Sequence, residues 1–214
     1  MSGLLGNVQA LALQFHDDLQ TVMRRKAKQI SELRVRVIGF RDFFYDDAPA
    51  LEVSDFFQLP EQNKAFAEFI RSLVATGGGD NPESALEALS LAVNSDWKFG
   101  GGKRRHVITM WTDEAAHDLR DARHRPIPEG QQTYPTQDVA RSLEELTTWW
   151  CSRDIIDQDA RRLVLFAPNL YPWERIYRQW EETNHFPSEA GNGLSGTEYT
   201  KIIARLADSL VKTS

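Results

Sequence analysis

The chain has 214 residues, a length that suits one α/β domain, and we expect residues 1–214 to form a single domain. Hydrophobic residues make up 41% and charged residues 26%, which is enough for a sizeable core and argues against general disorder. The 25 basic and 31 acidic side chains give a formal net charge of −6, which argues against a nucleic-acid-binding surface.

Cysteine usage and hydropathy exclude further classes of protein. Cys151 is the only cysteine, so the sequence excludes an internal disulfide and a zinc site built on cysteines. No segment approaches the roughly 18 apolar residues that a membrane helix needs. The first residues carry acids early and lack the basic start of a signal peptide. We therefore expect a cytoplasmic protein with no membrane contact, provided that the true N-terminus is present.

The first half of the chain alternates helices and strands. Apolar residues at helical spacing predict a long amphipathic helix over about residues 4–28. The β-branched segment 34–40 predicts a strand, and segment 51–56 predicts a weaker strand that suits a sheet edge. A second helix is predicted from the apolar face formed by Phe66, Phe69, Ile70, Leu73 and Val74.

The second half continues this alternation. After three glycines, 77–79, comes Asp80, and Asn81 as N-cap with Pro82 at the first helical position predicts a helix start. Segment 107–112 reads as a buried strand that ends at Asp113, and 163–166 as another. Helices are predicted around 139–150 and 173–180 and from about 195 or 197 onward.

This order predicts an α/β fold with a doubly wound, mostly parallel sheet and helices on both faces. Ligands of such sheets bind beyond the carboxyl ends of the strands. Four side chains fall on the loops expected there, namely Asp42, Asp80, Asp113 and Asn169.

Asp80 and Asp113 are the candidate metal ligands. A carboxylate at the end of a strand can hold a hard cation such as Mg²⁺, directly or through water. The alternative for Asp80 is assistance in capping the next helix, and the alternative for Asp113 is the start of a turn. His117 is the histidine best placed to join this site, although a surface role also fits it.

Phosphate and nucleophile motifs are missing from the sequence. The glycine run continues as Asp-Asn-Pro-Glu and lacks the Lys-Ser/Thr pair of a phosphate-binding loop. No G-x-S-x-G segment is present, so a serine nucleophile has no support.

Three segments together resemble the von Willebrand factor A family, in particular a bacterial and protist branch. The glycine run with Asp80, Asn81, Pro82 and Glu83 resembles that branch's GGGDxPE element. Segment 35–42 resembles its V-G-V-I-G-F-R-D-Y strand, and segment 107–113 resembles its fourth strand, which ends in a metal-site Asp.

The resemblance implies a metal-ion-dependent adhesion site, at which a Mg²⁺ ion receives an acidic residue of a protein partner. Asp80 stands where the family has Thr, and Asp113 matches the third loop. The family's first strand and its D-x-S-x-S motif have no counterpart here, so we expect an N-terminally truncated domain with weak or absent metal binding.

The sequence therefore predicts a non-catalytic protein-binding module, with Asp42 and His117 as candidate partner-binding residues beside the metal site. The alternative is a metal-assisted hydrolase or phosphotransfer enzyme that uses Asp80, Asp113 and His117. A further interpretation makes Tyr171 and Trp173 part of an exposed aromatic patch for a partner, with core packing as its alternative.

Overall fold

The computed structural model describes residues 9, 12–45, 49–74, 82–100, 103–188 and 199–211. Its first elements are the 3₁₀ helix η1 (Ala12–Gln14) and the helix α2 (Phe15–Arg25). Asp17 and Asp18 lie in the first turn of α2 and Arg24 and Arg25 in the last, which suits the helix dipole. The predicted helix over 4–28 is confirmed as an α-helix for residues 15–25, while residues 12–14 form a 3₁₀ turn and residues 26–28 are not helical.

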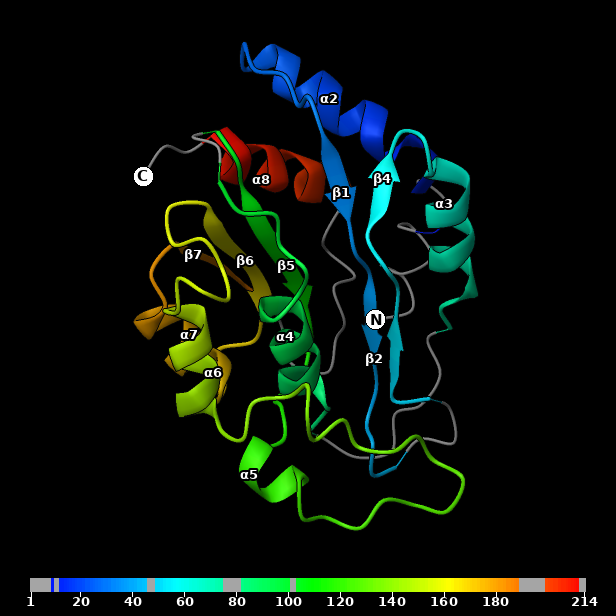
Figure 1. The fold of residues 1–214 in the computed structure, drawn as a ribbon, viewed down its shortest axis with the longest axis vertical. Helices are drawn as coiled ribbons and strands as arrows, with labels where there is room; N and C mark the ends of the chain where they lie inside the picture. The colour runs from blue at the N-terminus through cyan, green and yellow to red at the C-terminus, as the bar shows by residue number, and fades with distance from the viewer. Residues whose placement is uncertain are drawn as a thin grey trace.

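A long antiparallel hairpin follows and contains four short strands. These are β1 (Leu33–Val35), β2 (Ile38–Phe40), β3 (Leu51–Val53) and β4 (Phe57–Leu59), in which β1 pairs with β4 and β2 pairs with β3 (Figure 1). The predicted strand 34–40 is therefore divided into β1 and β2, the predicted strand 51–56 is confirmed only for β3, and β4 lies beyond the predicted segment. The interruption lies at Ser54, whose hydroxyl accepts a hydrogen bond from Val37 N–H at 2.9 Å. Helix α3 (Asn63–Ser72) packs on β4 through Phe66, Ala67 and Ile70.

The other sheet is parallel and contains β5 (His106–Trp111), β6 (Arg161–Ala167) and β7 (Thr183–Pro187) in that order. His106 pairs with Arg161, and Leu163 pairs with Thr183. Every residue of β6 is buried, as a strand covered on both faces should be. The predictions at 107–112 and 163–166 are confirmed, whereas β7 was not predicted.

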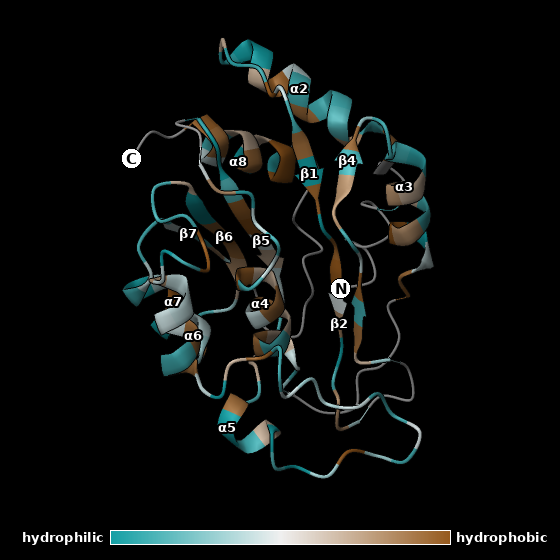
Figure 2. Ribbon diagram, viewed as in Figure 1, coloured by the Kyte–Doolittle hydropathy of each residue, from teal (hydrophilic) through white to brown (hydrophobic). Residues whose placement is uncertain are grey.

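Helices cover both faces of this parallel sheet (Figure 1). One face packs Ile108 and Leu165 against α4 (Ala85–Val93), α6 (Leu143–Trp150) and α7 (Trp173–Gln179). The other face packs Val164 and Phe166 against Ile202 of α8 (Tyr199–Val211). This division follows from the period of two along a strand, which sends alternate side chains to opposite faces. In Figure 2 the apolar colour marks both β5 and α8. The chain is thus a mixed α/β protein with a three-stranded parallel sheet.

Helix α4 joins the hairpin to the parallel sheet. It packs against β2 and also against β5, although these two strands belong to separate sheets in the described part of the chain. The helix begins at Ala85, later than predicted. Glu83 is not helical but forms a parallel β-bridge with Ala116, so the predicted helix start at Pro82 is wrong. The predicted N-cap, Asn81, lies outside the described residues.

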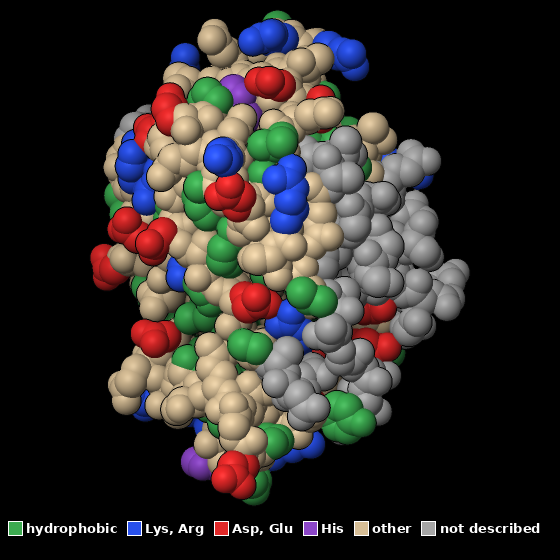
Figure 3. All heavy atoms as spheres, turned by 90° about the vertical axis from the view of Figure 1, so that its right-hand side faces the viewer, with side chains coloured by type: hydrophobic (Ala, Val, Ile, Leu, Met, Phe, Trp, Pro, Cys, Tyr) green, Lys and Arg blue, Asp and Glu red, His purple; other side chains and the backbone are tan. Residues whose placement is uncertain are grey.

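The surface carries mixed charges. On the side where α3 lies, acidic and basic side chains of the described residues are interspersed (Figure 3). Within the described ranges, no helix combines the length and the apolar character that crossing a lipid bilayer requires.

Candidate functional site

Three loops meet at the carboxyl ends of β2 and β5. They comprise residues 41–45 after β2, 82–84 before α4 and 112–118 after β5, toward the lower end of Figure 1. Backbone hydrogen bonds join them: Glu83 N–H donates to the Ala115 carbonyl at 3.0 Å, and His117 N–H donates to the Glu83 carbonyl at 2.9 Å. The edge predicted to carry the site is therefore a connected structure.

Asp42 is the centre of this edge. Its side chain is buried, with 2% of the residue exposed, and one oxygen, Oδ1, lies within hydrogen-bond reach of three donors. Phe44 N–H donates to it at 3.0 Å, His117 Nε2 lies at 3.1 Å, and the Ser84 hydroxyl lies at 3.5 Å. We call Asp42, Ser84 and His117 the Asp42 cluster. It ties together one residue from each of the three loops.

Two polar side chains flank the ring of His117. Nε2 faces Asp42, and Arg125 Nη1 lies 3.5 Å from Nδ1. Phe44 fixes the ring from the side, because its own ring meets the imidazole edge-on at 5.0 Å and is covered by the Arg125 guanidinium.

Opposing effects act on the pKa of Asp42. Burial is the largest and raises it, but the hydrogen bonds from His117 and Phe44 and the nearby charges of His117 and Arg125 together hold the pKa of Asp42 below its ordinary value. Asp42 is therefore ionised at neutral pH. A buried carboxylate that is hydrogen-bonded and paired in this way holds the loops in position.

A second buried acid lies one turn further along α4. Glu87 is completely buried and accepts a hydrogen bond from the Tyr134 hydroxyl at 2.8 Å, while its other oxygen, Oε2, makes no hydrogen bond with a described residue. Burial raises the pKa of Glu87 to about 7, the bond from Tyr134 acts against this, and burial also raises the pKa of Tyr134. Glu87 therefore retains its proton to a higher pH than an exposed glutamate does.

Of the two predicted metal ligands, the structure describes Asp113. Asp113 lies two residues beyond the end of β5 and is partly buried, while Asp80 lies outside the described residues. Among the residues that the structure describes, no three His, Cys, Asp or Glu side chains are grouped as metal ligands. The Mg²⁺ site at Asp80 and Asp113 stays a prediction.

The aromatic residues after β6 divide into an exposed and a buried set. Tyr171 is 49% exposed and Leu170 41%, whereas Trp173 is fully buried and donates its indole N–H to the Glu114 carbonyl at 2.7 Å. The interpretation of Trp173 as part of an exposed patch is therefore wrong, and core packing, its alternative, applies. Trp173 instead anchors the start of α7 to the loop after β5.

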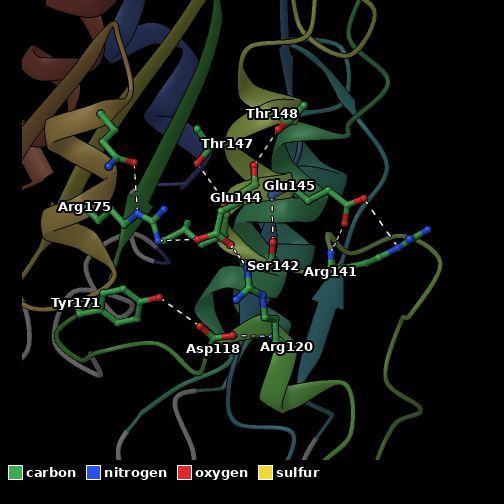
Figure 4. A network of polar contacts seen from close by, with 12 residues as sticks. Asp118, Arg120, Arg141, Ser142, Glu144, Glu145, Thr147, Thr148, Tyr171 and Arg175 are labelled. Carbon is green, nitrogen blue, oxygen red and sulfur yellow. Dashed lines mark hydrogen bonds and ion pairs between the residues drawn. The ribbon is translucent and has the colours of Figure 1, made fainter.

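Tyr171 stands beside a surface network of charged residues (Figure 4). Its hydroxyl donates to Asp118 Oδ2 at 3.2 Å, which links the loops after β5 and β6. Arg120 and Arg175 both point at Glu144, at 2.6 and 2.8 Å. A backbone hydrogen bond, then the hydrogen bonds from Arg175 and Ser142, lower the pKa of Glu144, and the charge of Arg120 adds to this. Tyrosine and arginine side chains thus lie exposed on the same edge.

Comparison with known proteins found no family model that matches the chain and no matching curated relative. The residues that sequence reasoning missed are Ser84, Glu87, Arg125 and Tyr134. Glu87 did leave a signal, since it is the one charged residue in the apolar segment Ala85–Val93. No sequence pattern marks Ser84, Arg125 or Tyr134, because their contacts join loops that lie far apart in the sequence.

Proposed function

We propose that this chain is a non-catalytic protein-binding module of the von Willebrand factor A type, built on a doubly wound α/β fold. The carrying observation is the burial of the Asp42 cluster, which joins three loops at one edge of the strands. In this proposal the buried Asp–His pair positions the loops that carry the binding surface. In this fold, β2 and β5 are the two strands that the family's first strand would join.

The proposed contact surface consists of Leu170 and Tyr171 with the neighbouring Arg120 and Arg175. Tyrosine and arginine are enriched among the residues that contribute most to protein–protein affinity. Because Tyr171 is held by Asp118 and the adjacent Trp173 is held by Glu114, little conformational entropy is lost when a partner binds.

A divalent cation is the second part of the proposal. Asp113 and Asp80 would hold Mg²⁺ weakly, and an acidic residue of the partner would complete its oxygen ligands. The metal-assisted hydrolase, the alternative, needs an accessible base beside the acids. His117 is only 8% exposed, and its described partners are Asp42 and Arg125, which supports the binding module instead.

The contact surface is tested by selecting short peptides from a displayed random library on the folded chain. We expect the selected peptides to contain acidic residues and to lose most of their affinity for the Tyr171→Ser variant. Phe99→Ser is the matched control, because Phe99 is also 49% exposed but precedes β5 at the opposite end of that strand. Equal loss in both variants, or no loss in either, contradicts the proposed surface.

The cation is tested separately by titrating Mg²⁺ while recording amide resonances of the chain. We expect shifts at Asp113 with a dissociation constant of about 1 mM or weaker, and their loss in Asp113→Asn. If the resonances of residues 112–118 do not respond at all, the chain acts without a cation and this part of the proposal fails.

A further inference from the structure

A cavity of about 310 Å³ lies away from the Asp42 cluster, where the loop before α6 crosses β3 and α4. Its apolar wall is formed by Leu51 and Val53 of β3 and Leu91 of α4. The loop is held in place because the Gln132 side chain accepts a hydrogen bond from Leu51 N–H at 2.9 Å. The volume is at the small end of the range for small-molecule sites.

Arg36 supplies the charge in this cavity. The side chain is partly buried, and its guanidinium is fixed by protein oxygens: Nε donates to the Ser54 carbonyl at 3.0 Å, and Nη1 donates to the Ser95 hydroxyl at 2.8 Å and the Leu91 carbonyl at 3.3 Å. Its remaining nitrogen, Nη2, makes no hydrogen bond within the described ranges. The guanidinium is therefore oriented but retains donor capacity.

Arg36 also lacks a counter-ion among the described residues. Other arginines with a well-covered side chain have one: Arg41 lies 2.7 Å from Glu52, and Arg162 lies 3.3 Å from Glu182. Burial lowers the pKa of Arg36, and only the more distant Asp55 acts against this. A partly desolvated, oriented guanidinium without a carboxylate favours an anion, and the planar fork matches a carboxylate.

We propose that this cavity binds a small organic acid, whose carboxylate pairs with Arg36 and whose apolar body lies on Leu51, Val53 and Leu91. The apolar wall favours an organic acid over an inorganic anion, because an inorganic anion has no apolar part and would leave the wall in contact with water. Asp138 lies on the exposed rim, where water screens its charge. The proposal does not depend on the proposed function, because the cavity includes neither the Asp42 cluster nor Tyr171.

The experiment titrates the full chain with 4-methylpentanoate and with its uncharged amide while recording amide resonances. We expect saturable shifts at the cavity residues, with the acid binding about tenfold tighter than the amide or more, as a charged hydrogen bond requires. N-acetyl-glycyl-leucine, tested beside its C-terminal amide, shows whether a peptide carboxyl terminus is the better source of the same group.

Two variants locate the site. Arg36→Gln removes the charge and should abolish the preference for the acid. Because Arg36 also holds Ser54 and Leu91, a second variant, Thr133→Trp, blocks the exposed rim and leaves Arg36 unchanged; it should weaken binding of both probes. Asp138→Asn is the control and should bind the acid as well as the unmodified chain or better.

Equal affinity for acid and amide overturns the proposal. So does the absence of shifts at cavity residues with about 20 mM of either acid, since even millimolar binding would be detected at that concentration. Unchanged binding in a folded Thr133→Trp variant also overturns it, whatever the behaviour of Arg36→Gln.

Discussion

Asp42 serves three donors with a single carboxylate oxygen, and each donor belongs to a different loop or turn. Removing the carboxylate leaves Phe44 N–H and His117 without their acceptor in a buried place. A buried donor that loses its acceptor costs far more than an exposed pair that is broken.

We expect Asp42→Ala to lower the free energy of unfolding by about 3–5 kcal/mol, the range for breaking one side of a buried ion pair. Urea denaturation monitored by circular dichroism measures this. Asp17→Ala is the matched control, because Asp17 also lies 3.0 Å from a histidine, His16, but its side chain is 83% exposed. The control should lose less than about 1 kcal/mol, and similar losses in both variants would contradict the structural role of Asp42.

Glu87 predicts a dependence of stability on pH. Its pKa is about 7 in the folded chain against 4.5 for the ordinary group, so the folded state retains a proton that the unfolded state loses. Its contribution to stability is fully present below about pH 4.5 and is lost as the pH rises to about 7. The lowered pKa of Asp42 acts in the opposite sense, since that contribution is lost as the pH falls.

Replacing Glu87 isolates its part of this dependence. Glu87→Gln keeps an oxygen for Tyr134 and cannot ionise. Between pH 5 and pH 8, the free energy of unfolding of the variant should therefore rise relative to that of the unmodified chain by up to about 3 kcal/mol, at about 1.4 kcal/mol per pKa unit. Urea midpoints at the two pH values measure the difference. A constant difference between the two proteins across this range would contradict a raised pKa.

Buried strands are the elements that the sequence predicts best. The segment 163–166 is apolar throughout and lies in β6, where every residue is buried. Strand β7 escaped prediction because Thr183, Asn184 and His185 carry no apolar pattern, and its position depends on pairing with β6. The start of α4 was misplaced because Pro82 and Glu83 suit a helix locally, whereas a tertiary bridge holds Glu83 in extended form.

Helix α6 has a capped start whose contribution can be measured. The Ser142 hydroxyl accepts a hydrogen bond from Glu145 N–H at 3.2 Å, and the Glu145 carboxylate accepts one from Arg141 N–H (Figure 4). Ser142→Ala should lower the free energy of unfolding by about 1 kcal/mol. Thr148→Ala, an exposed position later in the same helix, is the control in the same denaturation assay and should change stability by less than half of that.

At the scale of the whole molecule, the parallel sheet and the β1–β4 hairpin differ in how much packing stabilises them. Strand β6 lies between two strands and two layers of helix, whereas β2 pairs with β3 in a two-stranded hairpin. Two-stranded hairpins are marginal without further packing, and here α3 and α4 supply it.

Hydrogen exchange in the native state should therefore resolve two opening events. We expect the amides of β6 to exchange only through global unfolding and those of β1–β4 to exchange through an opening of lower free energy. Exchange measured by NMR at increasing urea concentrations distinguishes them. The same opening free energy for both groups would mean that the hairpin and the parallel sheet unfold as one unit.

For the candidate site, the sequence predicted its location in the whole fold but not the contacts within it. The rule that ligands of parallel sheets bind at the carboxyl ends of the strands located the loops of Asp42, Asp113 and His117. It could not indicate that Asp42 and His117 form a pair, because 75 positions separate them. The same rule could not indicate that Trp173 is buried, because its indole N–H donates to the carbonyl of Glu114, which is distant in the sequence.

The position of α8 has a consequence for how the chain is made. In the described part of the chain, this helix is the one that covers Val164 and Phe166, and it also packs against α2. Because synthesis proceeds from the N-terminus, β5, β6 and β7 exist before the helix that shields them. The contacts that Ile202 makes with Val164 and Phe166 therefore form only after residues 199–211 have been synthesised.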